Sequence, residues 1–206
     1  MPSDDLTGLL NAFRDVPTSI ISDSLDRFAG PLGLRPFHRG GKLAGRALTV
    51  RTRAGDNRAL HEALARIGPN DVLVVDGAGD VTRALVGEIL KEIAVSKGAA
   101  GFVIDGAIRD SDAFAAGDFP CYARAVTHLG PYKVGPGEIS VPVSIGGHVV
   151  SPGDFVVGDM DGVVTFAPAR ATELLDVCRQ AIKREAEIIE SIREGRYTGA
   201  YGTSKQ

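Results

Sequence analysis

The chain has 206 residues, of which 44% are hydrophobic and 24% are charged, and it contains 26 glycines and 11 prolines. This composition indicates a globular protein with many turns and short strands, and the length suits one domain with a helical tail. The net charge of −3, without a cluster of Lys and Arg, argues against a nucleic-acid interface. No apolar run reaches the roughly 18 residues of a membrane span, so we expect no membrane partner either.

The expected location follows from the N-terminus and the cysteines. The first ten residues, MPSDDLTGLL, lack the basic-then-apolar pattern of a secretion signal. Cys121 and Cys178 do not belong to a paired motif, which fits a reducing compartment. We therefore expect a cytoplasmic protein in which both cysteines are plain core residues.

The first fifty residues predict two helical segments followed by a strand. Residues 5–29 contain the helical segments, which are separated by Val16-Pro17-Thr18. Thr18 or Ser19 is the expected cap of the second segment, because their hydroxyl groups can accept from a free backbone N–H. Residues 43–53 alternate in part between apolar and polar side chains, as a strand does.

The next stretch predicts a parallel β–α–β unit. Asp56-Asn57 opens a helix, and Pro69-Asn70-Asp71 turns the chain into the apolar strand 72–75. A strand, a helix and a strand joined by short connections indicate parallel pairing with a right-handed crossover. His61 stands alone on this helix, and we expect it to pack partly buried and not to bind a ligand.

Residues 84–114 form the stretch around which the rest of the chain is organised. A helix is predicted here, with apolar residues at helical spacing at Leu85, Ile89, Ile93 and Ala94. Lys97-Gly98 supplies a cation and a glycine at its end. Residues 101–104 are typical of a strand covered on both faces, and Asp105-Gly106 is expected to turn the chain toward Arg109-Asp110.

The remaining residues predict short strands and a long terminal helix. Strands are expected at residues 120–126, 139–145, 148–150, 154–157 and 163–166, with a hairpin turn at Asp159-Met160-Asp161-Gly162. Residues 169–195 predict an amphipathic helix, and the last eleven residues read as an arm. A parallel half followed by an antiparallel half, without a break in composition, indicates one layered α/β domain.

Three charged residues of the central stretch form a candidate site. Polar groups that follow the carboxyl ends of strands in an α/β sheet usually carry its chemistry. Arg109 offers a planar fork for a carboxylate, and Asp110 offers hard oxygen donors for Mg²⁺ or Mn²⁺. Glu88 lies in the first turn of the predicted helix, whose amides after Val86-Gly87 suit an anion. The alternative is a solvated Arg-Asp pair in an ordinary surface loop.

The sequence resembles the RraA-like family over nearly its whole length. The resemblance rests on seven segments in the same order, PTSIISDSLDR, GRALTV, DNRALHEAL, PNDVLVVDG, GEILKEIAVSKGAAGFVIDGAIRD, GPYKVGPGEISVPVSIGG and PGDFVVGDMDGVV. This family includes 4-hydroxy-4-methyl-2-oxoglutarate and 4-carboxy-4-hydroxy-2-oxoadipate aldolases as well as ribonuclease E regulators. The resemblance implies a single domain over residues 1–206 with a swivelling-domain-like β/β/α fold, in which residues 169–206 form a C-terminal helix and arm.

The resemblance also implies a class II retro-aldolase that uses Mg²⁺ or Mn²⁺ and releases pyruvate from a 2-oxo acid. The family's motif is an acidic residue, twenty residues and then Arg-Asp, which here corresponds to Glu88 and Arg109-Asp110. By this resemblance Asp110 binds the metal, Arg109 holds the pyruvate part of the substrate, and Glu88 orients a water or transfers a proton. The backbone amides of Gly87, Glu88, Ile89 and Leu90 would bind the substrate carboxylate. Loss of CO₂ from oxaloacetate gives the same enolate, so decarboxylation is an expected side or main activity.

The family likeness further implies a homotrimer or a dimer of trimers. An acidic residue on the C-terminal helix of a neighbouring subunit would complete the outer shell of the metal, with Glu185 as the best match and Glu187 as the alternative. The other function on this scaffold is a non-catalytic, protein-binding regulator of the ribonuclease E type.

Two departures from the family pattern concern the site. Glu88 is one methylene longer than the aspartate expected there. The acid expected three residues after Asp110 is replaced by Ala113, with Asp112 one position earlier.

Overall fold

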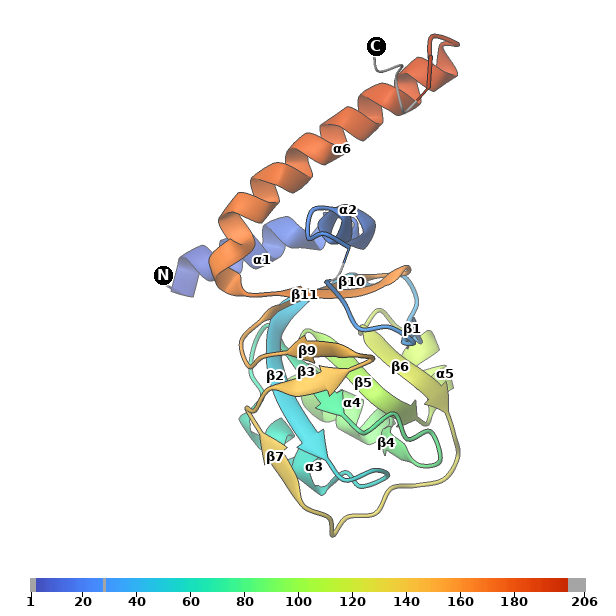
Figure 1. Cartoon of the computed structure of the whole chain (residues 1–206). Helices are drawn as coiled ribbons and strands as arrows, with labels where there is room; N and C mark the ends of the chain where they lie inside the picture. Colours follow the sequence, from blue (N-terminus) through green and yellow to red (C-terminus); the bar gives the residue numbers. More distant parts are fainter. Residues whose placement is uncertain (1–2, 28, 200–206) are drawn as a thin grey trace.

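The computed structural model describes residues 3–27 and 29–199 (Figure 1). The strands are β1 (Arg35–Pro36), β2 (Leu43–Thr52), β3 (Asp71–Asp76), β4 (Ala84–Val86), β5 (Gly101–Ile108), β6 (Cys121–Val126), β7 (Gly137–Ile139), β8 (Val143–Ile145), β9 (His148–Val150), β10 (Phe155–Asp159) and β11 (Gly162–Phe166). The helices are α1 (Ser3–Arg14), α2 (Thr18–Asp23), α3 (Arg58–Arg66), α4 (Glu88–Ser96), α5 (Ser111–Ala115) and α6 (Ala171–Arg193), and the 3-10 turn Pro168–Arg170 precedes α6.

One mixed sheet of nine strands holds the molecule together. Its order is β1-β6-β5-β3-β2-β10-β11, with β4 paired to β5 and β7 paired to β2, while β8 and β9 form a separate hairpin. The central strands β2, β3, β5 and β6 are parallel. The predicted parallel β–α–β unit is confirmed as β2, α3 and β3. The remaining pairs are antiparallel: β1 with β6, β10 with β2 and β11, and β7 with β2.

Apolar side chains on the two faces of the sheet fill separate cores. On one face, Leu73, Val75 and Ile104 pack with residues of α3 and α4. On the other face, Val72, Val74 and Val103 pack with residues of the β8–β9 hairpin. The continuous apolar runs of β3 and β5 are therefore buried on both sides. These layers of helices, sheet and hairpin confirm the predicted β/β/α fold.

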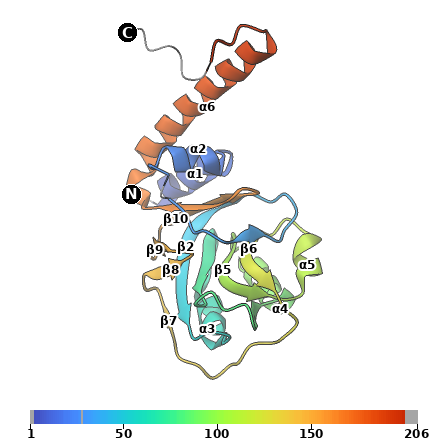
Figure 2. The same ribbon diagram turned by 45° about the vertical axis from the view of Figure 1, so that its right-hand side comes forward.

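A third core joins the terminal helices to the antiparallel end of the sheet. Phe13 of α1 packs against Phe155 and Phe166 with ring centroids 6.5 and 4.9 Å away. Leu174, Leu175 and Cys178 of α6 belong to the same cluster. Figure 2 shows α1, α2 and α6 together beside β10, at the end of the molecule away from α3 and β7. Both cysteines are buried, as expected.

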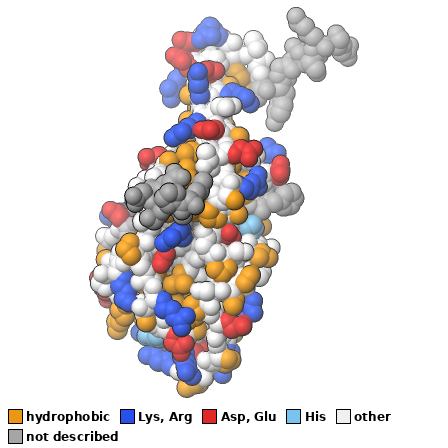
Figure 3. All heavy atoms as spheres, turned by 90° about the vertical axis from the view of Figure 1, so that its left-hand side faces the viewer, with side chains coloured by type: hydrophobic (Ala, Val, Ile, Leu, Met, Phe, Trp, Pro, Cys, Tyr) orange, Lys and Arg blue, Asp and Glu red, His pale blue; other side chains and the backbone are white. Residues whose placement is uncertain are grey.

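The C-terminal helix extends well beyond this core. After Cys178 its apolar residues become exposed, with Ile182, Ile189 and Ile192 at 37%, 46% and 52%. Acidic and basic side chains are intermixed over the face in Figure 3. Within residues 3–27 and 29–199 no helix combines the length and the apolar character needed to cross a bilayer. Residues 200–206 of the predicted arm lie outside the described part.

The predicted helix start at residues 84–86 is wrong. Ala84, Leu85 and Val86 form strand β4, which pairs in parallel with β5, and α4 begins only at Glu88. Leu85 is buried in this strand, whereas Ile89 in the first turn of α4 is 67% exposed. The short apolar run fits a buried strand as well as a helix, and pairing with β5 decides between them.

The predicted turn at Asp105-Gly106 is also wrong. Strand β5 continues to Ile108. It pairs with β6 on both sides of an irregularity between Ile104 and Ala107, and its last residues also pair with β4. Asp105 stays in the strand because it forms an ion pair with Arg124 of β6. A charge inside an apolar run therefore marks a cross-strand pair here and not the end of the strand.

Two smaller predictions are corrected by contacts distant in sequence. The cap of α2 is neither Thr18 nor Ser19, since Asp159 accepts from the Thr18 N–H at 2.9 Å and from its hydroxyl at 2.7 Å. The predicted strand 139–145 is divided into β7 and β8, which belong to different sheets. The hairpin turn between β10 and β11 is confirmed.

Candidate active site

The pairing of β4 with β5 brings the three predicted site residues together. Val86 and Ile108 are partners in this parallel ladder, so the residues that follow each of them are neighbours. The Arg109 N–H donates to Val86 O at 3.0 Å and extends the ladder by one bond. Gly87 and Glu88 therefore lie next to Arg109 and Asp110, at the carboxyl ends of two parallel strands.

Asp110 caps helix α4 from the other strand. Its Oδ2 accepts from the Glu88 N–H at 3.0 Å and lies 3.6 Å from Arg109 Nε. The carboxylate thus balances the positive end of α4 and the Arg109 guanidinium together. One of the α4 amides expected to bind an anion, that of Glu88, is therefore already bonded to the Asp110 carboxylate.

The backbone conformations of Asp110 and Gly87 allow this contact. Asp110 is left-handed, with φ 54° and ψ 42°, a conformation that aspartate tolerates but most residues avoid. A Cβ on Gly87 would lie 2.4 Å from Asp110 Oδ2 and 2.9 Å from Arg109 Cγ. Glycine at position 87 is therefore required for the approach of both side chains.

Two cavities meet at Arg109. The first, which we call the His61 cavity, has a volume of about 210 Å³, and the second, the His128 cavity, has about 480 Å³. The His61 cavity is lined by Asn57, His61, Ala84, Leu85, Val86, Gly87, Ile89, Leu90, Arg109, Gly130, Pro131 and Lys133. The His128 cavity is lined by Glu88, Arg109, Asp110, Ser111, Asp112, Ala113, Val126, Thr127 and His128.

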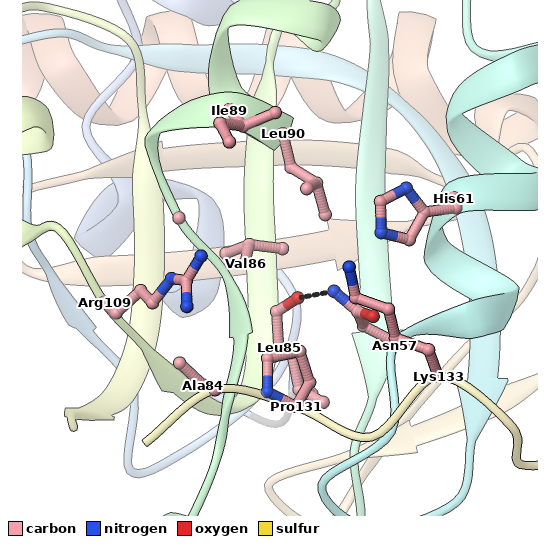
Figure 4. Close-up of a pocket in the computed structure, with 12 residues that line it drawn as sticks. Asn57, His61, Ala84, Leu85, Val86, Ile89, Leu90, Arg109, Pro131 and Lys133 are labelled. Carbon is pink, nitrogen blue, oxygen red and sulfur yellow. Dashed lines mark hydrogen bonds between the residues drawn. The ribbon is translucent and has the colours of Figure 1, made fainter. Parts of the chain in front are cut away.

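The wall of the His61 cavity opposite Arg109 is polar. Figure 4 shows Arg109 on one side and Asn57, His61 and Lys133 on the other, with Leu90 between them. Asn57 Nδ2 donates to Leu85 O at 3.0 Å, and its buried Oδ1 has no partner among the described residues. Desolvation, together with the charge of Lys133, lowers the pKa of His61, which favours the neutral imidazole at pH 7.

The expectation that His61 is partly buried packing is therefore wrong. Its side chain is exposed and lines a cavity with two other polar residues that the sequence did not single out, Asn57 and Lys133. One signal was present, because Asn57 and His61 are four residues apart and so share a helix face. Lys133 lies in a loop whose position follows from long-range contacts only.

A buried carboxylate holds that loop in place. Asp56, with a fully buried side chain, accepts from the N–H groups of Arg58, Val134 and Gly135 at 3.0, 3.0 and 2.6 Å. The Asn57 N–H also donates to Tyr132 O at 3.0 Å. Burial alone would raise the pKa of Asp56, but the three backbone bonds and the charge of Arg53 outweigh it and lower the pKa.

The acidic side chains of one chain make only part of a metal site. Among the described residues no group of three His, Cys, Asp or Glu side chains is arranged to hold a metal ion. Asp110 and Glu88 nevertheless line one cavity and offer hard oxygen donors, which fits Mg²⁺ or Mn²⁺, since such ions take one or two carboxylates and complete their shell with water or substrate. The donor set therefore suits a divalent cation shared with a ligand.

The predicted outer-shell acids lie elsewhere in the chain. Glu185 and Glu187 are exposed on the projecting part of α6, beyond the residues Ala171–Cys178 that pack in the third core. In Figure 1 this part of α6 points away from α3, β4 and α4. Either residue can reach Asp110 only in a second copy of the chain, so this assignment stays a prediction.

Comparison with known proteins identifies the family. The sequence profile of the RraA-like family, described as Aldolase/RraA, matches residues 18–165. The chain belongs to the RraA-like family. A relative from Halalkalibacterium halodurans, provisionally named a 4-hydroxy-4-methyl-2-oxoglutarate aldolase, is 41% identical over 179 residues, which cover 86% of this chain and 84% of the relative.

Solved structures share the fold of this chain, and one of them is an RraA protein. An uncharacterised protein from Pseudomonas syringae pv. tomato matches with a TM-score of 0.84 and 27% identity, over 92% of this chain and 90% of its own. The RNA-processing inhibitor RraA from Thermus thermophilis matches with a TM-score of 0.68 and 34% identity, over 74% of this chain and 93% of its own. The family thus contains proteins named for catalysis and proteins named for inhibition.

We predict that Asp56→Ala destabilises the protein by about 3 kcal/mol at pH 7, because three backbone N–H groups lose their buried acceptor. The folded pKa of Asp56 is lowered, so its stabilisation is present above the unfolded pKa of about 3.9 and is lost as the pH falls toward the folded value. Urea unfolding should therefore show a gap between variant and wild type at pH 7 that narrows below about pH 4.

The control is Asp23→Ala, which removes an exposed ion pair with Arg27. It should cost less than about 1 kcal/mol. Equal losses for the two variants at pH 7 would contradict the role given to Asp56.

Proposed function

We propose that this RraA-like protein is a divalent-metal-dependent carbon–carbon lyase that cleaves a 4-hydroxy-2-oxo acid and releases pyruvate. The observation that carries the proposal is the joint placement of Arg109, Asp110 and the start of α4 at the meeting point of two cavities. A carboxylate that can bind a cation, a guanidinium and backbone amides around this meeting point suit a substrate with a carboxylate next to an oxo group. The provisional aldolase name of the 41% identical relative supports the same reaction class.

Arg109 is the proposed anchor of the pyruvate part of the substrate. Its side chain is 41% exposed and lines both cavities, so its fork is open to a ligand. A guanidinium binds a carboxylate through two parallel hydrogen bonds and stabilises charge on a neighbouring oxygen. The amides of Gly87, Ile89 and Leu90, beside it in the His61 cavity, would supply further donors.

Asp110 is the proposed ligand of Mg²⁺ or Mn²⁺. Its Oδ2 is used by α4, while Oδ1 accepts no hydrogen bond from the described residues. When bound, a divalent cation acts as a Lewis acid and withdraws electron density from the 2-oxo group, which makes the negative charge of the pyruvate enolate easier to form. Glu88, on the same cavity, is the proposed group for proton transfer, directly or through a water.

The rest of the substrate would occupy the His61 cavity. Its wall combines apolar surface from Val86 and Leu90 with the polar groups of Asn57, His61 and Lys133. A hydroxyl-bearing chain needs both kinds of surface, and the neutral imidazole can accept as well as donate. Oxaloacetate loses CO₂ through the same enolate, so we include decarboxylation in the proposed activity.

We predict pyruvate release from a panel of 4-hydroxy-2-oxo acids, including 4-hydroxy-4-methyl-2-oxoglutarate, and from oxaloacetate when Mg²⁺ or Mn²⁺ is present. Lactate dehydrogenase coupling measures the product, and EDTA should abolish it. A mechanism through a lysine Schiff base would survive EDTA. Lys133 is the lysine lining the His61 cavity, whereas Lys91 and Lys97 donate to backbone carbonyls.

The matched variant for this assay is Arg109→Lys, which keeps the charge and removes the fork. It should lower kcat/KM at least about a hundredfold with an unchanged melting temperature. Arg46→Lys serves as the control. It alters an exposed ion pair between β2 and Asp71, the first residue of β3, at the end of β3 away from the site. Full activity of Arg109→Lys, or no pyruvate from the wild type on any substrate, contradicts the proposal.

We further propose a homotrimer or a dimer of trimers as the active form. The support is the row of exposed apolar residues Ile182, Ile189 and Ile192 on α6, with Glu185 beside them on the same projecting helix. An exposed apolar row on a helix that leaves its own domain is typical of a helix that packs on another subunit. Residues of a second α6 would then be placed to reach the site.

Light scattering tests the assembly. We predict a mass of three or six times 21.6 kDa, and Ile189→Glu should shift it toward smaller species because a charge enters the apolar row. A 21.6 kDa particle at micromolar concentration would rule the assembly out.

The second candidate is a non-catalytic regulator that binds a ribonuclease of the E type. The likeness to the RNA-processing inhibitor from Thermus thermophilis favours it. The two candidates separate in one pair of experiments. Stoichiometric binding of such a ribonuclease without pyruvate release supports the regulator, and metal-dependent pyruvate release supports the lyase.

A further inference from the structure

A second bond joins α4 to the segment that carries Asp110. Lys91, three residues after Glu88, donates from Nζ to Ala113 O at 2.9 Å. Ala113 stands three residues after Asp110, so the two contacts run side by side, Glu88 with Asp110 and Lys91 with Ala113. Helix α4 therefore holds both the first and the last residue of the segment 110–113.

Lys91 and the backbone of Asp110 are connected through Ala113. Ala113, whose carbonyl oxygen accepts from Lys91, donates its own N–H to Asp110 O at 3.0 Å. Lys91 thus fixes the turn in which Asp110 adopts its left-handed conformation. A left-handed aspartate costs free energy relative to the right-handed form, so it persists only where its surroundings hold it.

Lys91 is an unusual lysine for a helix surface. Its side chain is only 13% exposed, and Nζ lies 5.9 Å from the Phe114 ring centroid and 3.2 Å from Glu92 Oε1. Lysine is seldom buried to this degree without partners. The carbonyl, the ring face and the neighbouring carboxylate are all sites that favour a cation.

Lys91 lies outside the ligand-binding surface. It lines neither the His61 cavity nor the His128 cavity, and its nitrogen is committed to Ala113 O. A direct role on a substrate is therefore not available to it in this arrangement. Its effect on the site runs through Asp110.

We propose that Lys91 is a positioning residue, which locks the 110–113 turn onto α4 so that Asp110 can cap the helix with Oδ2 and keep Oδ1 for a cation. The second half of this statement rests on the proposed function, since only there does Asp110 bind a metal. The first half concerns the fold of the turn and can be tested without substrate.

The residue that follows α4, Lys97, offers a control for the experiment. Lys97 also donates from Nζ to a backbone carbonyl, that of Ala65 in α3, at 3.0 Å, on a side chain away from Asp110. Lys91→Met and Lys97→Met each keep the apolar stem and remove one such bond. Lys91→Arg keeps a cationic donor and serves as the rescue variant.

Amide hydrogen exchange, followed by mass spectrometry, measures how often the hydrogen bonds of the 110–113 turn open. We predict that Lys91→Met exchanges about tenfold faster at the amides of Glu88 and Ala113, because the bonds that protect them open more often. Lys97→Met should match the wild type in these segments, and Lys91→Arg should restore most of the protection. Mn²⁺ titration should show about tenfold weaker binding for Lys91→Met alone.

Each outcome decides the inference. Wild-type exchange at Glu88 and Ala113 in Lys91→Met overturns it, as does faster exchange spread evenly over the molecule that Lys91→Arg does not rescue. Local faster exchange with unchanged Mn²⁺ affinity overturns the link to the cation. Local faster exchange in a protein whose wild type neither binds Mn²⁺ nor releases pyruvate supports the role of Lys91 in the turn and refutes the proposed function instead.

Discussion

The candidate site depends on one contact, the hydrogen bond from the Glu88 N–H to Asp110 Oδ2. It exists because β4 and β5 run in parallel and end at the same level, with Val86 opposite Ile108. The contact gives the first turn of α4 an acceptor, holds a carboxylate next to the Arg109 guanidinium, and needs glycine at position 87 to form. Sheet register, helix capping and the placement of charge are therefore parts of one arrangement.

Two further contacts keep that arrangement rigid. Lys91 ties α4 to the turn after Asp110, and Asp56 ties the start of α3 to the loop that carries Lys133. Asp56 is fully buried and Lys91 is largely buried, and each has several partners, so leaving either charge unpaired would be costly and the contacts specify one geometry. The walls of the His61 cavity come from segments far apart in sequence, and Asp56 brings two of those segments together.

The sequence was sufficient for the regular parts of the fold. A continuous apolar run located β3, partial alternation located β2, and turn residues between short strands located the β10–β11 hairpin. It failed at Leu85 and at Asp105. A three-residue apolar strand such as β4 is too short to show a hydrophobic period. A charged residue that pairs across strands, such as Asp105, resembles the end of a strand when the partner strand is unknown. Long-range pairing with β5 and β6 decided both positions.

The candidate site also contains residues that the sequence predicted and residues that it did not. Glu88, Arg109 and Asp110 were found from their spacing and from the family resemblance, and the structure places them together. Asn57, His61 and Lys133 were missed as a group, because their proximity depends on the loop bonded to Asp56 and to Gly55. The most direct test is a crystal structure with Mn²⁺ and oxalate, a mimic of the pyruvate enolate. The account predicts anomalous density for Mn²⁺ bonded to Asp110 and oxalate held by Arg109, and Mn²⁺ bound away from Asp110 would contradict it.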